Sequence, residues 1–237
     1  MKKLFNDGWQ FAELAFDEAS MYKDGNPVLF TPDQFFDSAD AQTYRPVTVP
    51  HDWQIYHVND LYKNSTGFYK KTFTLTAEQV NDHHSAIRFE AIYMNSAVWV
   101  NGKKAGEWKY GYSTFEFDIS SLVHEGENEV LVIAVYQHCN TRWYSGAGII
   151  RDVYFLNTPK TYIVSDGVYF SAVPVDANKL SGEWKIKLST EVMSLPGLTG
   201  QSAQLSDVQI IGSNPIMTNY RITHKITAPG GPTFASY

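Results

Sequence analysis

An imidazole stands next to a carboxylate at His51-Asp52-Trp53, and such a pair activates the nucleophile in many hydrolases. Activation requires the two side chains to meet, whereas neighbours on an extended segment point to opposite faces. Pro50 restricts the backbone here, and the sequence shows no matching nucleophile. We therefore expect a structural motif in which Asp52 is buried and hydrogen-bonded and Trp53 is an anchor at an interface.

Two further clusters have the residue types of catalytic or metal sites. Glu116 and Asp118 lie on one face of an alternating segment, which predicts a solvated strand face. His83-His84 lies in a polar stretch from Gln79 to Ser85, and a metal site would need further ligands at suitable spacing. We expect a solvated loop there, and neither a metal nor a cofactor in this chain.

The segment Tyr144-Ser145-Gly146-Ala147-Gly148 has a glycine spacing that could cradle a phosphate. The Lys-Ser/Thr pair and the helix that follow such a loop are missing. The better interpretation is that Gly146 and Gly148 adopt positive φ or allow a close backbone approach, with Tyr144 in the same structural motif. Arg151-Asp152 is expected to form a structural charge pair.

Arg142-Trp143 is the pair best suited to bind a small molecule. Arginine offers a rigid fork of donors to neighbouring hydroxyls, and tryptophan offers a flat surface to C–H groups. A sugar carries both kinds of group. The alternative is that Arg142 pairs with an acid at a domain interface and that Trp143 only packs.

The elements that must position these residues are strands. Residues 130–136 are apolar on both faces and β-branched, which predicts a central strand covered on both sides. Alternating segments predict further strands, and Asn101-Gly102 is a strong hairpin signal. These segments are 87–93, 98–100, 107–108 as the start of the return strand, 115–119 and 151–156.

Helical signals are few. Thr31 and Pro32 predict a short helical turn, with Thr31 as its N-cap and Pro32 at the first position. No long helices alternate with the strands, which argues against a doubly wound parallel sheet. Many short strands joined by Gly, Asn and Pro turns predict an all-β chain, folded as a sandwich or a jelly roll.

The residue pattern changes near Pro159, so we place a domain boundary at about residues 158–162. Downstream, residues 184–188 and 220–226 alternate cleanly, which predicts two strands. An immunoglobulin-like sandwich has roughly seven strands in about 100 residues. The second piece has 77 residues and ends in turn residues, so we expect an incomplete sandwich there.

Charge and composition argue against several partners. The 237 residues carry a formal net charge of −6 and lack the basic stripe that polyanion binding needs. There is no run of about 18 apolar residues that would predict a membrane span, and the first residues do not resemble a signal peptide. We expect no nucleic-acid or membrane partner and a cytoplasmic protein, unless a leader has been removed. The single cysteine, Cys139, is expected to be a small buried hydrophobic residue.

Three segments resemble the amino-terminal domain of the family 2 glycoside hydrolases, the family of bacterial β-galactosidases and β-glucuronidases. They are residues 49–55, residues 67–73 followed by the strands at 87–91 and 98–103, and residues 141–153. They occur in the family's order, and residues 111–118 between them also look like a strand of the family. The resemblance covers about residues 5–160.

The resemblance implies a jelly-roll sugar-binding-like domain over residues 1–160 and an immunoglobulin-like sandwich over residues 161–237. In the family, a catalytic (β/α)₈ barrel with two catalytic glutamates follows, and such a barrel needs roughly 250 residues of its own. We therefore assign no catalytic residue to this sequence. The resemblance also implies that the loop before Ser145 reaches the mouth of the barrel, which makes Arg142 and Trp143 the expected substrate-binding residues.

Three functions follow as hypotheses. The chain is expected to be the non-catalytic amino-terminal region of a retaining β-galactosidase-like hydrolase, inactive alone and partnered by the missing barrel. One alternative is a free-standing, lectin-like module that binds carbohydrate. The other is a structural module that docks a barrel or builds a homo-oligomer interface.

Overall fold

The computed structural model describes residues 1–16, 22–24, 26–138, 144–177, 184–194, 201–206, 225–227 and 233–236. The chain divides into two compact units, Met1–Pro159 and Lys160–Tyr237, and each is described by itself. Both units are built from antiparallel strands, so the chain has the all-β fold that the sequence predicts.

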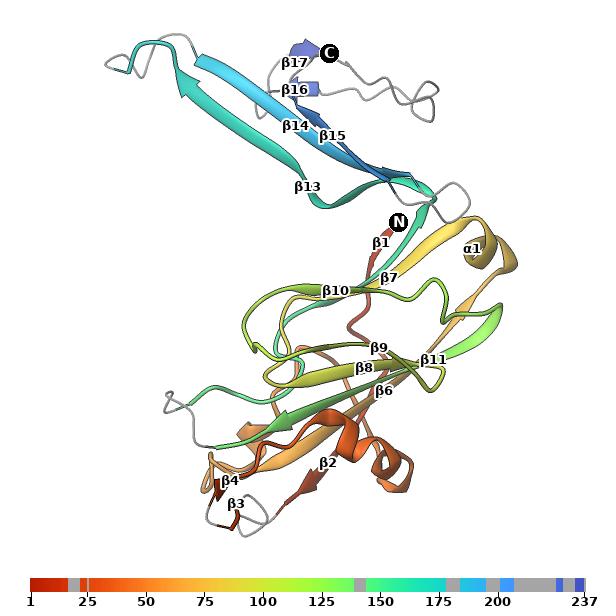
Figure 1. Cartoon of the computed structure of the whole chain (residues 1–237), viewed down its shortest axis with the longest axis vertical. Helices are drawn as coiled ribbons and strands as arrows, with labels where there is room; N and C mark the ends of the chain where they lie inside the picture. The colour runs from red at the N-terminus through yellow and green to blue at the C-terminus, as the bar shows by residue number, and fades with distance from the viewer. Residues whose placement is uncertain are drawn as a thin grey trace. The chain divides into compact units, whose positions relative to one another are not determined.

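Two antiparallel sheets face each other in the first unit, in a jelly-roll sandwich (Figure 1). The four-stranded sheet has the order β1 (Lys2–Leu4), β12 (Val153–Pro159), β7 (His83–Phe89) and β10 (Phe115–Asp118). The six-stranded sheet has the order β5 (Arg45–Val47), β2 (Trp9–Ala15), β6 (Ser65–Leu75), β11 (Gly126–Tyr136), β8 (Ser96–Val100) and β9 (Lys103–Trp108).

Strand β11 lies at the centre of the six-stranded sheet, between β6 and β8. Its inward side chains, among them Val132 and Tyr136, join the main core with Trp9, Tyr69 and Phe89. Leu131 and Ile133 point to the outer face of the sheet and pack in a second apolar cluster. The prediction of a central strand covered on both faces is therefore confirmed.

The outer face of the six-stranded sheet is covered by a 3₁₀ helix, η2 (Pro32–Ala41). Thr31 is its N-cap and Pro32 its first residue, as predicted, and the backbone N–H of Thr31 donates to Oε1 of Gln34 at 2.7 Å. Phe35 and Phe36 pack onto the outer cluster. The helix thus shields apolar strand residues that would otherwise face water.

The hairpin signal at Asn101-Gly102 is also confirmed. Both residues have positive φ, 50° and 74°, and they connect β8 to β9. The predicted start of the return strand, at residues 107–108, was wrong, because β9 begins directly after the turn at Lys103 and ends at Trp108. A two-residue turn starts its return strand at once, which the alternating pattern alone did not reveal.

Short elements complete the first unit. They are β3 (Tyr22–Lys23), β4 (Asn26–Pro27), the 3₁₀ helix η3 (Trp53–Tyr56) and α1 (Ala77–Asn81). Helix α1 has a capping box, in which Thr76 and Gln79 bond to each other's backbone N–H groups. No helix of the described residues is long and apolar enough to cross a membrane.

The second unit contains a three-stranded antiparallel sheet of β13 (Thr161–Pro174), β14 (Trp184–Ser194) and β15 (Gln201–Ser206), and a hairpin of β16 (Lys225–Thr227) and β17 (Thr233–Ser236). The strand predicted at 184–188 lies within β14. Of the strand predicted at 220–226, only Lys225 and Ile226 belong to the described residues, and both are in β16.

Candidate functional site

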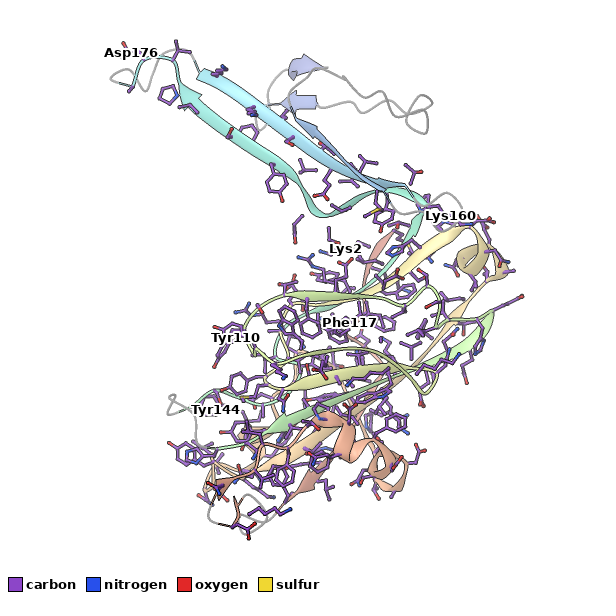
Figure 2. All side chains as sticks on the ribbon, in the orientation of Figure 1. Lys2, Tyr110, Phe117, Tyr144, Lys160 and Asp176 are labelled. Carbon is purple, nitrogen blue, oxygen red and sulfur yellow. The ribbon has the colours of Figure 1, made fainter. Side chains whose placement is uncertain are left out.

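Two segments far apart in the sequence are joined at one end of the first unit's sandwich. The backbone N–H of His51 donates to the carbonyl of Ile149 at 2.7 Å, and that of Trp53 donates to the carbonyl of Ala147 at 3.0 Å. Tyr144, which opens the second segment, lies at the same end of the unit as Tyr110 (Figure 2). The two motifs singled out in the sequence thus form one structure.

The carboxylate of Asp52 holds this junction together. Its Oδ1 accepts hydrogen bonds from the backbone N–H groups of Gln54, at 3.0 Å, and Ala147, at 2.9 Å. Its Oδ2 accepts a short hydrogen bond from the hydroxyl of Tyr144. Burial and this bond to Asp52 raise the pKa of Tyr144, so the phenol stays protonated as a donor. Asp52 is hydrogen-bonded as predicted, but it is only half-buried.

Both glycines of the second segment have the positive φ that their spacing indicates, 71° at Gly146 and 124° at Gly148. A Cβ atom at Gly146 would lie 2.9 Å from Oδ2 of Asp52. A Cβ at Gly148 would lie 2.3 Å from the hydroxyl of Tyr69 and 2.5 Å from the carbonyl of His51. The segment can therefore approach these partners only because it has no side chain at either position.

His51 is buried, with 7% of its surface exposed. Its Nδ1 lies 2.7 Å from the hydroxyl of Tyr69, and its Nε2 lies 3.2 Å from the hydroxyl of Tyr56. Burial, reinforced by the nearby Arg45 guanidinium, lowers the pKa of His51 to about 4, and the Asp52 carboxylate opposes this shift. His51 is therefore neutral near pH 7, with the hydroxyl of the buried Tyr69 on one side of its ring and that of the exposed Tyr56 on the other.

The sequence suggested that Trp53 is an anchor at an interface, but the structure places it elsewhere. Its side chain is fully buried within the first unit, where its ring stacks on Phe11 with 5.5 Å between the centroids. The indole N–H donates to Oγ of Ser65 at 2.9 Å. A Cβ at Gly67 would lie 2.4 Å from the ring, so this glycine provides the space that the indole fills.

Arg151 and Asp152 do not form the predicted charge pair. The exposed guanidinium of Arg151 donates to the carbonyl of Tyr112 at 3.4 Å. Asp152 instead accepts from the side-chain amide of Asn6 at 2.8 Å and from the hydroxyl of Tyr154 at 3.3 Å. The two residues, which directly precede β12, therefore bond to different neighbours.

The histidine pair also differs from its prediction. His83 and His84 begin strand β7, and His84 is 7% exposed. Its Nε2 lies 3.3 Å from the Asp118 carboxylate, and this hydrogen bond lowers the pKa of Asp118 to about 2. Glu116, on the same strand face, lies 3.8 Å from Arg88. Both acids therefore have cross-strand partners, through a hydrogen bond between Asp118 and His84 and an ion pair between Glu116 and Arg88. No cluster of the described residues has the ligands for a metal ion.

A cavity of about 370 Å³ opens beside the Asp52 junction. Its walls combine the carboxylate of Asp52 and the hydroxyl of Tyr144 with apolar surface from Ile55 and Ile150. The remaining lining residues are Pro50, His51, Ser145 and Gly146. Such a mixture of hydrogen-bonding groups and apolar patches is typical of sites for small polar ligands.

The predicted substrate-binding residues, Arg142 and Trp143, lie outside the described residues, as does Cys139. Tyr144, the next residue after them, lines the cavity. Sequence reasoning missed that Asp52 and Tyr144 line one cavity and that Tyr56 and Tyr69 flank His51. The only sequence signal for these contacts was at Tyr69, because the alternation of side chains along a strand places Tyr69 on the inward face.

Residues 4–159 match the family model described as "Glycosyl hydrolases family 2, sugar binding domain". The beta-galactosidase of Bacteroides ovatus is 31% identical over 147 residues, which are 56% of this chain and 17% of that protein. A relative from Formosa agariphila is 26% identical over 233 residues, covering 86% of this chain and 20% of its own length. The chain thus spans about a fifth or less of these curated relatives.

Solved structures agree with these matches. A glycosyl hydrolase family 2 member from Bacteroides cellulosilyticus is 26% identical with a TM-score of 0.61, covering 81% of this chain and 25% of that chain. A beta-glycosidase from Bacteroides vulgatus shares the fold at 24% identity and a TM-score of 0.57, covering 87% of this chain and 24% of its own.

Proposed function

Because the chain belongs to glycosyl hydrolase family 2 through the sugar binding domain in its residues 4–159, we propose that it works as the non-catalytic amino-terminal region of a β-galactosidase-like enzyme. In this role it supplies one wall of the sugar subsite, and a catalytic barrel supplies the rest. The observation that carries the proposal is the cavity that Asp52 and Tyr144 both line. Tyr144 directly follows Arg142 and Trp143 in the sequence.

The chemistry of this cavity suits a sugar. Oδ2 of Asp52 can accept from a sugar hydroxyl in addition to the hydroxyl of Tyr144. Ile55 and Ile150 offer apolar surface to the C–H face of a pyranose ring. Arg142 would add donors and Trp143 a flat aromatic surface.

Hydrolysis needs groups from elsewhere. A retaining glycosidase places two carboxyl groups about 5–5.5 Å apart across the scissile bond. Among the described residues, Asp52 is the one carboxylate that lines this cavity, and three donors already bond to it. We assign it to substrate binding, and the catalytic pair to a barrel partner.

We expect Arg142→Ala to damage catalysis more than folding in the enzyme that contains this chain. A charge-assisted hydrogen bond to a sugar hydroxyl contributes roughly 1.5–3 kcal/mol, so kcat/KM should fall about 10- to 150-fold. The melting temperature should stay nearly unchanged, because surface substitutions cost within about 0.5 kcal/mol. Kinetics and melting are measured on the same preparation.

Arg151→Ala is the matched control, because Arg151 is an exposed arginine whose described contact is one long bond to a backbone carbonyl. It should leave kcat/KM unchanged. If Arg142→Ala lowered the melting temperature and left the kinetics intact, Arg142 would be a structural ion-pair partner, and this loop would not face the substrate.

A free-standing lectin is the second candidate, favoured by the sugar binding domain itself. The two candidates differ in the affinity of the chain alone. Binding sites bury most of the surface of their ligand, and a chain that supplies only one wall of the site cannot do so. We therefore expect titration calorimetry of this chain with galactose or lactose to show no binding tighter than about millimolar, or −4 kcal/mol. A micromolar constant would replace our proposal with the lectin.

For the second unit we propose one half of an immunoglobulin-like sandwich. On one face of the three-stranded sheet, Phe170 of β13 is paired with Leu188 of β14, and Ala172 with Ile186. Phe170 and Ile186 are 61% and 43% exposed. Such an apolar face is what the inner side of a sandwich offers to an opposing sheet.

A further inference from the structure

A second cavity, of about 220 Å³, lies on the outer face of the six-stranded sheet beneath helix η2. It shares no lining residue with the cavity at Asp52. Its lining residues are Phe36, Asp37, Ala39, Asp40, Lys70, Trp99, Gly102, Glu129 and Leu131. At roughly 30 Å³ per water, this space holds about seven waters, which suits one small ring and not a chain of rings.

Trp99 is the unusual member of this wall. It is 5% exposed, and Phe36 packs 5.1 Å from its ring centroid, while the Lys104 ammonium lies 5.8 Å from that centroid. These neighbours cover the indole, so the part of the side chain left open is small. The open part includes Nε1. This atom has no hydrogen-bond partner among the described residues, yet it does not belong to the fully buried polar atoms without a partner.

The indole N–H of Trp99 donates no hydrogen bond to any described residue. The other three tryptophans whose side chains are described in the first unit all donate: Trp9 to the Phe5 carbonyl, Trp53 to Ser65 and Trp108 to Ser113. A largely buried donor without an acceptor is costly unless water or a ligand serves it. Trp99 lines the cavity, and its N–H has no acceptor among the described residues.

The charged groups at the cavity disfavour an anionic ligand. Asp37, Asp40 and Glu129 contribute carboxylates, against one ammonium from Lys70. Lys70 is already paired with Asp40 at 2.5 Å, which leaves the other two carboxylates as acceptors. The resulting negative potential repels phosphates and acidic sugars.

We propose that this cavity is a second carbohydrate-binding site, which takes one neutral hexose ring. The indole N–H of Trp99 donates to a sugar oxygen, and Asp37 and Glu129 accept from hydroxyl groups. Phe36 and Leu131 meet the C–H surface of the ring. The site does not depend on a catalytic barrel or on the cavity at Asp52.

The test follows the indole N–H signals of the whole chain by ¹H–¹⁵N NMR during titration with galactose, glucose or mannose. The Trp99 signal, assigned by its loss in Trp99→Phe, should move and saturate with a constant in the millimolar range. The Trp53 signal should stay fixed, because its N–H is bound to Ser65. Glucuronate, which has the same ring with a carboxylate, should not move the Trp99 signal.

Variants separate this site from its surroundings and from the proposed function. Glu129→Ala should weaken the hexose response roughly ten-fold, as expected for one bond to a charged acceptor. Glu127→Ala, an exposed glutamate on the same strand face that does not line the cavity, should leave it unchanged. Asp52→Asn should also leave it unchanged, whatever its effect on the enzyme.

Three results would overturn the proposal. One is a Trp99 signal that no neutral hexose moves. Another is an equal response to glucuronate or a tighter response to a simple alkylammonium ion, which would make the cavity a site for another class of ligand. The third is an equal loss of response in Glu127→Ala and Glu129→Ala. If Trp99→Phe fails to fold, this pair of glutamate variants still decides.

Discussion

Gly148→Ala is expected to destabilise the first unit by at least about 3 kcal/mol. The added Cβ would lie 2.3 Å from the Tyr69 hydroxyl and 2.5 Å from the His51 carbonyl, at a φ of 124° that side-chain-bearing residues rarely adopt. Tyr69 cannot easily move, because it is fully buried and its hydroxyl bonds to His51. Chemical denaturation followed by tryptophan fluorescence measures the loss, since five of the six tryptophans lie in residues 1–159.

Gly8→Ala is the control for backbone strain alone. Gly8 has a φ of 72°, and an added Cβ meets nothing within 4 Å, so this variant should cost only about 1–2 kcal/mol. The difference between the two variants isolates the overlap at the junction of the two segments. Equal costs would mean that the 144–149 segment relaxes freely, and that Gly148 does not fix its approach to His51.

Acid should weaken the first unit in the range from about pH 6.5 to about pH 4, through His51. The pKa of this imidazole is about 4 in the folded protein, against an ordinary 6.5. As the pH falls through 6.5, the unfolded chain takes up a proton that the folded chain refuses. The stability present above pH 6.5 is therefore lost progressively, by on the order of 3 kcal/mol in total, with no further loss from this residue below about pH 4.

The measurement is a series of denaturation curves across this pH range, together with an NMR titration of the His51 ring. His51→Gln should flatten the pH dependence, whereas His124→Gln, which alters a histidine in an exposed turn, should preserve it. The titratable and charged groups that face His51 are Arg45, Asp52, Tyr56 and Tyr69. A His51 ring that titrates near 6.5 in the folded protein would contradict the prediction.

Local features could be predicted from the sequence because their causes are local. Asn101-Gly102 specifies its own turn, Thr31 and Pro32 specify a helix start, and the apolar run of β11 requires cover on both faces. Each signal lies within a few residues. The same holds for the positive φ at Gly146 and Gly148.

The site could not be assembled in this way, because its contacts are long-range. Asp52 and Tyr144 are separated by 92 residues, and only the register between distant segments brings them together. Trp53 shows a second difficulty, since a tryptophan is buried equally well in a core and at an interface. His84 meets Asp118 across two strands, a pairing that a polar stretch of sequence does not reveal.

The apolar face of β13 and β14 affects how the chain behaves in solution. Where no sheet covers Phe170 and Ile186, two copies can pack these faces against each other. Lys185 and Lys187 alternate with the apolar residues of β14 and place like charges on its opposite face. If sheets stacked face to face into a fibre, every second interface would have to bury these lysines. We therefore expect the apolar faces to associate as a closed pair of chains and not as a growing fibre. We therefore expect these two lysines to limit polymerisation.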